Sequence, residues 1–292
     1  MELLLRIVGI ITPVLLVGAV GYAYGRRVRP NMAAVNRLST DVLFPALIFS
    51  SMAAKDFVIA EQGPLLAAGT LMMLGSGVVG WGAARVLGYN VHAFVPSMMF
   101  TNTANMGLPL TLFAFGPELL PPAVALFMVS SLLHFTLGIR ITAPQASLRG
   151  ILQGPMLWAM LLGVLLSLFR VSLPPWLATG LKMIGEAAIP LGLLTLGVGF
   201  SGFRVERWSI GIVGALLCPL SSLIVLWPLL GVFDLEPAQR GLLLLYAALP
   251  PAVMNYILAD RYGQDPGLVS AIVVGGNLAS LAFVPLALYL GL

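Results

Sequence analysis

Long apolar runs separated by short polar connections make up nearly the whole chain. Each run holds about 20 mostly apolar residues, the length that a helix needs to cross a membrane. The runs do not alternate with polar residues as the strands of a membrane barrel would, so the pattern predicts helices. The connections between the runs are too short to hold a soluble domain. Ten membrane-spanning segments are predicted, at residues 4–25, 36–54, 63–87, 92–115, 119–140, 155–170, 176–200, 208–233, 238–260 and 267–290.

The composition supports a multi-pass membrane protein. Hydrophobic residues form 59% of the chain and charged residues only 9%, whereas a soluble domain carries roughly 25% charged residues. This excludes a soluble enzyme, a nucleic-acid-binding protein and a disordered chain. The single cysteine, Cys218, permits neither an internal disulfide nor a thiolate metal cluster. The first apolar run ends at Arg26 and Arg27 rather than at a cleavage site, so we expect a retained helix.

Basic residues predict the orientation, because cytoplasmic loops carry an excess of Lys and Arg. With the N-terminus outside, most of the 15 basic residues fall at cytoplasmic ends. We therefore expect a cell-membrane protein whose two termini both lie outside. The predicted cytoplasmic set is Arg26, Arg27, Arg29, Arg37, Arg85, Arg140, Arg149, Arg204, Arg207 and Arg261, against Arg6, Lys55, Arg170, Lys182 and Arg240 outside.

The two halves of the chain are weakly similar to each other. Residues 37–45 match residues 182–190, since a basic residue, an acid and a proline recur at the same spacing. Trp81 and Trp227 also match at nearly the same offset. Residues 1–145 and 146–292 are thus predicted to be two repeats of five helices. An odd number of helices in each repeat inverts the second one, an architecture found in many secondary transporters.

Matching segments of the two halves carry helix-breaking residues. The fourth predicted helix contains TNTANMGLPL, with Gly107 and Pro109, and the ninth contains ALPPAVMNY, with Pro250 and Pro251. Proline lacks a backbone donor and its ring clashes with the carbonyl four residues earlier. We therefore expect both helices to be broken within the membrane.

Amides and hydroxyls flank these breaks, and no acid lies in the central part of either segment. The predicted substrate-binding residues are Asn102, Thr103, Asn105, Asn255 and Tyr256. Broken helices also leave positively polarised half-helix N-termini, which favour an anion such as a carboxylate. The alternative is structural, because prolines often only kink membrane helices and asparagine can bond a neighbouring helix.

Three further residues are candidates for ion coupling: Asp41, Glu186 and His134. Acids within the membrane are functional candidates, and histidine can carry a proton near neutral pH. Arg37 and Lys182, however, each precede an acid by four residues and can neutralise it on one helix face. His134 can equally be a hydrogen-bonded packing residue.

The segments FTNTANMGLPL, ALPPAVMNYILADRYGQDPGLVSAIVV and DVLFPALIFSSMA resemble the auxin efflux carrier family. That family includes the plant PIN-formed auxin carriers and bacterial relatives proposed to move organic acids. The resemblance implies crossed fourth and ninth helices, a scaffold of helices 1, 2, 6 and 7, and a transport unit of helices 3–5 and 8–10. It also implies elevator-like movement and a homodimer. The long cytoplasmic loop of the plant carriers is absent.

Together these features predict a secondary transporter of a small organic anion, either auxin-like or a mono- or dicarboxylate. The coupling ion is H⁺ or Na⁺, although the ninth helix lacks the acid that bile acid symporters use for sodium. The alternatives are a cation/proton antiporter of related fold and a membrane sensor that binds without translocating. Catalytic residues at the spacing of an enzyme are absent from the sequence, and no cofactor, metal site or nucleic-acid partner is expected.

Overall fold

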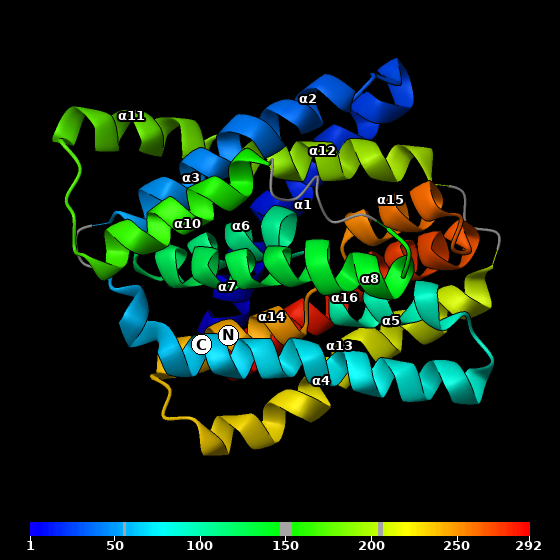
Figure 1. The fold of residues 1–292 in the computed structure, drawn as a ribbon. Coiled ribbons are helices and arrows are strands. Elements are labelled where there is room, and N and C mark those ends of the chain that lie inside the picture. Colours follow the sequence, from blue (N-terminus) through cyan, green and yellow to red (C-terminus); the bar gives the residue numbers. More distant parts are fainter. Residues whose placement is uncertain (55–56, 147–153, 204–206) are drawn as a thin grey trace.

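The computed structural model describes residues 1–54, 57–146, 154–203 and 207–292. Within these ranges the chain is built of helices and turns, and the described residues form no β-strand. The long helices α4 and α13 run side by side, and α7 packs against α4 (Figure 1). Lys55, Arg149 and Arg204, which contribute to the predicted orientation, lie outside the described residues.

The helices differ widely in length. The four longest are α1 (Glu2–Val28), α4 (Gly63–Leu87), α13 (Trp208–Val232) and α16 (Pro266–Gly291). The shorter ones are α2 (Ala33–Leu38), α3 (Phe44–Met52), α5 (Val91–Met99), α6 (Leu108–Phe115), α7 (Leu120–Leu133), α8 (Ile139–Thr142), α10 (Pro155–Leu168), α11 (Pro175–Glu186), α12 (Ala188–Gly202), α14 (Pro237–Ala247) and α15 (Val253–Tyr262). π-Helical turns at Ser39–Leu43 and His134–Gly138 join α2 to α3 and α7 to α8.

Six helical segments in the described chain are long and apolar enough to cross a membrane. They coincide with the predicted spans at 4–25, 63–87, 119–140, 176–200, 208–233 and 267–290. The other four predicted spans are helical but interrupted or short. The span at 36–54 contains a π-helical turn, the span at 155–170 shortens to α10, and those at 92–115 and 238–260 each divide into two helices. A protein with several apolar helices of this length is a multi-pass membrane protein.

Polar side chains define several helix ends. Asn90 caps the start of α5 by accepting a hydrogen bond from the backbone of His92. Asp265 caps α16 in the same way and also pairs with Arg207 at 3.0 Å. Helix α4 ends at Gly88, which has a left-handed φ of 70° that a glycine adopts without strain. These caps satisfy backbone groups where the helices turn back.

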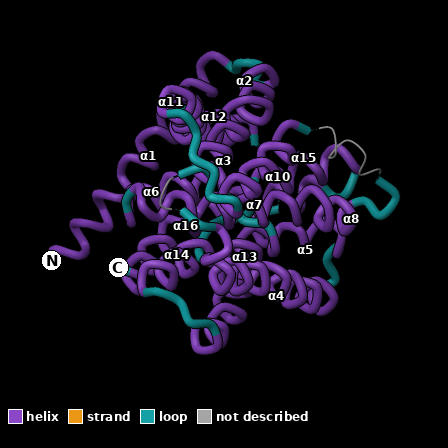
Figure 2. The backbone as a smooth tube through the Cα atoms, turned by 60° about the vertical axis from the view of Figure 1, so that its left-hand side comes forward, coloured by secondary structure: helices purple, strands orange, loops and turns teal. Residues whose placement is uncertain are grey.

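The helices pack as two groups (Figures 1 and 2). In one group, α1 packs against α12, and α3 packs against α10 and α11. In the other, α13 packs against α4 and α16, with α5 and α14 beside them. Both groups use glycines for close approach: a Cβ on Gly197 would clash with the backbone of α1, and one on Gly275 with Gly211. Small residues at such contacts let membrane helices approach closely.

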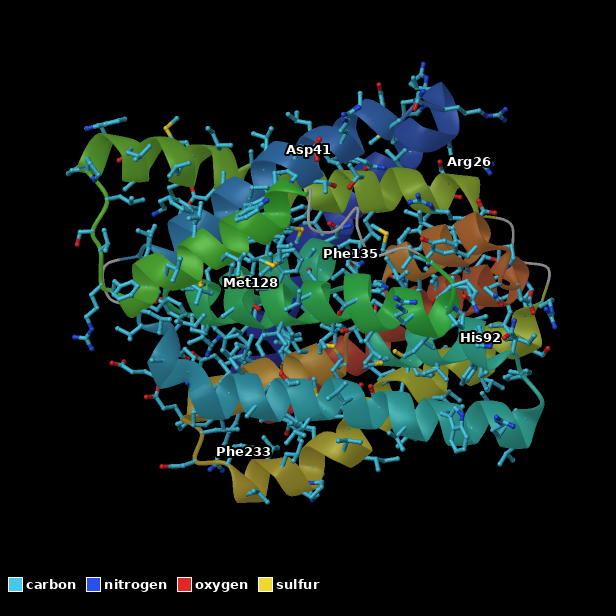
Figure 3. All side chains as sticks on the ribbon, viewed as in Figure 1. Arg26, Asp41, His92, Met128, Phe135 and Phe233 are labelled. Carbon is cyan, nitrogen blue, oxygen red and sulfur yellow. The ribbon has the colours of Figure 1, made fainter. Side chains whose placement is uncertain are left out.

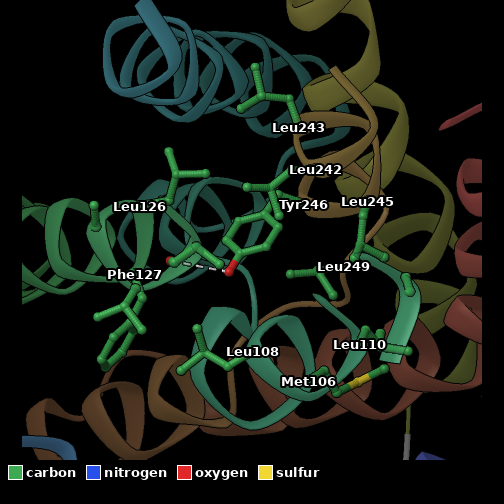
Figure 4. Packing of buried hydrophobic residues seen from close by; sticks show 14 of the residues in the cluster. Met106, Leu108, Leu110, Leu126, Phe127, Leu242, Leu243, Leu245, Tyr246 and Leu249 are labelled. Carbon is green, nitrogen blue, oxygen red and sulfur yellow. Dashed lines mark hydrogen bonds between the residues drawn. The ribbon is translucent and has the colours of Figure 1, made fainter. Parts of the chain in front are cut away.

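The buried core lies where the two groups meet and follows α6, α7 and α14. Figure 4 shows Tyr246 of α14 among leucines, with Leu126 and Leu108 from the other two helices. The Tyr246 hydroxyl donates a hydrogen bond to the Ala123 carbonyl at 3.3 Å. Because the surrounding lipid is as apolar as leucine, this core is held by close packing and such hydrogen bonds rather than by exclusion of water.

The sides of the molecule are apolar. Arg26 and His92 lie toward the same end in Figure 3, and Phe233 lies toward the opposite end. Large hydrophobic side chains between the ends face outward, among them Val78, Leu161 and Trp227. The long helices therefore present an apolar belt that suits a bilayer.

Candidate functional site

The first interruption lies between α5 and α6. Helix α5 ends at Met99, and Phe100 takes an extended conformation with φ −109° and ψ 104°. A π-helical turn, Thr103–Gly107, then leads into α6. The sequence predicts this break within residues 101–110, with Gly107 and Pro109 as its cause, and the chain leaves the helix at residues 100–102, near the start of that segment. Pro109 lies inside the continuous helical segment Thr103–Phe115, directly after the π-helical turn, so the interruption at residues 100–102 lies before it.

The second interruption lies between α14 and α15. Helix α14 ends at Ala247, and α15 starts after Ala252, whose φ of −66° and ψ of 140° are extended. Pro250 and Pro251 occupy the stretch between them, as the sequence predicts. Proline favours an extended conformation in the residue before it, so the pair keeps this stretch out of the helix.

The two extended stretches cross and pair with each other. The Asn102 backbone N–H donates to the Pro250 carbonyl at 2.8 Å, and the Ala252 N–H donates to the Phe100 carbonyl at 3.0 Å. Between these bonds, Thr101 lies opposite Pro251 in a single antiparallel bridge. The central position of such a bridge needs no N–H donor, so it tolerates proline. This pairing satisfies backbone groups that would otherwise be unbonded at membrane depth.

Two asparagines reinforce this crossing and keep polar atoms unused. Asn255 is buried, and its Nδ2 donates to the Phe100 carbonyl at 2.9 Å, while its Oδ1 has no hydrogen-bond partner among the described residues. Asn102 is also buried; its Oδ1 accepts from the Asn105 N–H at 3.3 Å, and its Nδ2 has no partner there. A buried amide group without a partner is destabilising, by roughly 1–3 kcal/mol. The crossing thus offers a free donor and a free acceptor.

A histidine completes the crossing from the α7 side. The His134 ring stacks on Phe100 with a centroid separation of 4.2 Å and an interplanar angle of 3°. The Asn255 side-chain amide lies within hydrogen-bonding reach of this ring, although no well-aligned hydrogen bond to Nε2 of His134 forms among the described residues. His134 therefore adds a third buried polar atom to the same place, and it packs against the backbone segment that carries Asn102.

The remaining predicted binding residues lie around the crossing in different directions. Thr103 is buried, and its N–H donates to the Thr101 carbonyl at 2.8 Å. Asn105 extends toward α12, where a Cβ on Gly192 would lie 2.8 Å from its Oδ1. The Tyr256 ring packs edge-on against Phe203, 4.8 Å between centroids, so its contacts lie with the end of α12. The structure brings Asn102 and Asn255 together but directs Asn105 and Tyr256 toward α12.

Other residues also shape the crossing, and of these Gly276 and Phe100 have no clear signal in the sequence. A Cβ on Gly276 of α16 would clash with the Pro251 ring, so a glycine is required for this contact. Gly107 lies against Tyr246, where a Cβ would come within 3.2 Å of the ring. Phe100 supplies both the accepting carbonyl and the stacked ring.

The two candidate coupling acids lie away from this cluster. Asp41 pairs with Arg37 at 3.3 Å and Glu186 pairs with Lys182 at 3.7 Å, each within its own helical segment. The acidic side chains are 42% and 50% exposed. Both intrahelical ion pairs expected from the sequence are therefore present. No group of three or more metal-binding side chains occurs in the residues that the structure describes.

The structure is that of a multi-pass membrane protein with a cluster of buried polar side chains inside its apolar belt. Two half-helices begin at the crossing, at Thr103 and Val253, and aim positively polarised N-termini at it. Apolar helices surround it, and two main-chain hydrogen bonds join residues 100–102 to residues 250–252. Buried side-chain atoms of Asn102, His134 and Asn255 have no partner among the described residues, which is typical of a site for a small solute in a transport protein.

Comparison with known proteins identifies the family. Residues 139–290 match the family model described as "Membrane transport protein". An uncharacterized transporter of Methanothermobacter thermautotrophicus is 30% identical over 278 residues, which covers 88% of both chains. An uncharacterized transporter of Methanocaldococcus jannaschii is 24% identical over 199 residues, 64% of both chains. The chain belongs to the membrane transport protein family of the auxin efflux carrier type, and it is a membrane transporter. Because the family consists of transporters, this agrees with the expectation that the protein is not an enzyme.

Proposed function

We propose that the protein is a secondary transporter of a small organic anion, an auxin-like compound or another mono- or dicarboxylate. The substrate carboxylate binds at the crossing of the two interrupted helices. Asn102 and Asn255 contact it or hold the backbone around it, Thr103 lies beside them, and Asn105 and Tyr256 line the path beside α12.

The observation that carries this proposal is the unpartnered Nδ2 of Asn102. It is a buried donor, and it lies at the start of a half-helix whose N-terminus favours negative charge. A buried donor without a partner lowers the stability of the fold, so stability alone does not explain this residue. A ligand carboxylate would satisfy it with a charge-assisted hydrogen bond, which is stronger than a bond between neutral groups. The Asn255 Oδ1 and the His134 Nε2 would then contact a hydroxyl, N–H or protonated group of the same ligand.

We further propose ten membrane spans in two inverted repeats, residues 1–145 and 146–292. Helices α1–α3 and α10–α12 form the scaffold, and α4–α8 and α13–α16 form the unit that carries the substrate. The contacts support this division, since most helices pack within their own group. Movement of the second group past the first, as an elevator, would expose the crossing to either side of the cell membrane. Both termini would lie outside, and the scaffold would form a homodimer.

The coupling ion is proposed to be H⁺ or Na⁺. A cation/proton antiporter is less well supported, because Asp41 and Glu186 are half exposed and already paired. A sensor that binds without translocating would show binding but no exchange. The antiporter and the sensor would therefore give different results in the transport experiment described next.

The test is solute counterflow in proteoliposomes preloaded with a panel of mono- and dicarboxylates. We expect exchange of a carboxylate by the wild type and its loss in Asn102→Ala. Asn277→Ala is the matched control, because the Asn277 amide donates only to the Val273 carbonyl of its own helix, at 2.8 Å. That variant is expected to retain exchange.

Each alternative outcome would change the proposal. Sodium- or potassium-linked proton flux without any organic solute would support the antiporter. Saturable carboxylate binding without counterflow would support the sensor. Normal exchange by Asn102→Ala would remove this residue from the substrate site.

A further inference from the structure

A groove lies on the side of α4, and its lining differs from that of the crossing. A groove of about 630 Å³ runs between α4, α5 and the segment that joins α7 to α8. This volume is within the range of roughly 300–1,000 Å³ typical of ligand sites. One end of the groove is basic and the remainder is apolar. The lining residues are Leu74, Gly77, Val78, Trp81, Arg85, Val91, His92, Val95, Met99, Leu137, Arg140 and Ile141.

The basic end is formed by three side chains from three helices. Arg85 comes from the last turn of α4, Arg140 from α8 and His92 from the first turn of α5. The Arg140 guanidinium donates one hydrogen bond to the Pro144 carbonyl at 2.7 Å, and His92 Nδ1 donates to the Ile141 carbonyl at 2.6 Å. Neither arginine forms an ion pair with an acid in the described part of the chain. The two guanidinium groups therefore keep donors for an anion.

The apolar part continues from the basic end along α4. The Arg85 guanidinium lies over the Trp81 ring, 5.3 Å from its centroid, and Val78 and Leu74 follow one and two turns further on. Val78 is 69% exposed and Trp81 51%, so this wall faces outward in the apolar belt. From Arg85 to Leu74 the helix rises about 16 Å. This equals roughly half of the ~30 Å hydrocarbon core of a bilayer.

We propose that this groove binds an anionic phospholipid. The phosphate contacts Arg85 and Arg140, and one acyl chain lies along Trp81, Val78 and Leu74. Arginine forms a planar donor fork that suits phosphate. A soluble anion is disfavoured as the occupant, because the groove opens on the face that contacts lipid and its length fits one leaflet. Basic pockets between membrane helices are known to bind anionic headgroups in this manner.

The experiment is native mass spectrometry of the full-length protein in mild detergent, titrated with phosphatidylglycerol or phosphatidylcholine. We expect the wild type to retain phosphatidylglycerol preferentially. The double variant Arg85→Gln, Arg140→Gln is expected to bind it at least tenfold more weakly, because each lost charge-assisted hydrogen bond lowers affinity by about that factor. Arg26→Gln, Arg27→Gln is the control of equal charge, since α1 does not line the groove.

A second variant separates the groove from general surface charge and does not depend on the arginines. Val78→Trp fills the apolar wall and keeps both guanidinium groups, and it is expected to reduce retention of phosphatidylglycerol. Unchanged retention in Val78→Trp, or equal loss in the Arg26, Arg27 control, would overturn the proposal. Equal thermal stabilisation of the wild type by inorganic phosphate would assign the site to a soluble anion instead and would also overturn it.

Discussion

Asn102→Ala and Asn255→Ala should separate substrate binding from structural support at the crossing. Both residues are buried asparagines beside the same backbone bridge. Asn255 uses its Nδ2 to bond the Phe100 carbonyl at 2.9 Å, whereas the Nδ2 of Asn102 has no partner among the described residues. The two substitutions remove the same atoms from the protein but different interactions.

The expected free energies follow from these contacts. Asn255→Ala removes a hydrogen bond between membrane segments, which contributes about 0.6 kcal/mol on average and up to ~1.7 kcal/mol. Asn102→Ala removes the 3.3 Å bond from the Asn105 N–H that caps the half-helix, a loss of about 0.5–2 kcal/mol, and also removes an unsatisfied donor, a gain of roughly 1–3 kcal/mol. Because these two contributions offset each other, its free energy of unfolding without substrate should stay close to that of the wild type. A hydrogen bond from Asn102 to a carboxylate contributes roughly 1.5–3 kcal/mol, so its loss should weaken substrate binding about 10- to 150-fold.

The chain contains its own reporter for the stability measurement. Cys218 is the single cysteine, it is fully buried, and its Sγ lies 4.0 Å from the Leu249 carbonyl next to the second interruption. A thiol-reactive fluorophore should label it only on unfolding. The melting temperature of Asn255→Ala should fall by a few °C and that of Asn102→Ala should not. Substrate affinity is measured by the dependence of counterflow on carboxylate concentration.

The reverse pattern would refute the reasoning. If Asn102→Ala melted as far below the wild type as Asn255→Ala and kept the wild-type affinity, Asn102 would be a packing residue. The free Nδ2 would then have no role in transport, and the proposal of a carboxylate site would lose its main support.

Two further predictions concern positions outside the amide cluster. Gly276→Val should lower the free energy of unfolding by about 1–3 kcal/mol, because the added side chain overlaps the Pro251 ring. Gly82→Ala is the control and should not lower it, because the space around its Cβ is open. Equal melting temperatures of the two variants in the thiol assay would contradict the contact between Gly276 and Pro251. Asp41→Asn and Glu186→Gln should keep at least half of the wild-type carboxylate counterflow, because each acid is exposed and paired within its own helix. Loss of counterflow in either variant, with folding intact, would instead assign that acid to ion coupling.

The sequence predicts both interruptions, and the second one more closely than the first. Pro250 and Pro251 mark the second one because two adjacent prolines block helix formation locally. The first one lies at residues 100–102, near the start of the predicted segment 101–110 and several residues before Gly107 and Pro109. Its position is set by pairing with the second stretch, a contact between segments about 150 residues apart. Local helix-breaking signals contain no information about such a partner.

Some side chains of the site could be recognised from the sequence and others could not. Asn102 and Asn255 were identifiable as polar residues beside a break, and both are buried at the crossing. Phe100 and Gly276 were not, because an aromatic residue and a glycine are ordinary in membrane helices. Tyr256 adjoins the second break in sequence, yet its ring packs on Phe203, since one face of α15 is turned toward α12. Direction around a helix depends on its neighbours, which sequence spacing alone does not define.

The backbone bridge between residues 100–102 and 250–252 also limits where a gate can form. Two main-chain hydrogen bonds join the extended stretches to each other. Neither stretch can therefore move alone to release a solute unless both hydrogen bonds break. The pair would have to travel as one piece. If the transport unit moves as proposed, its sliding surface would lie elsewhere, and the contact of Asn105 with Gly192 on α12 would mark one point along it. A bulky residue at position 192 would obstruct that movement and would leave the backbone bridge intact.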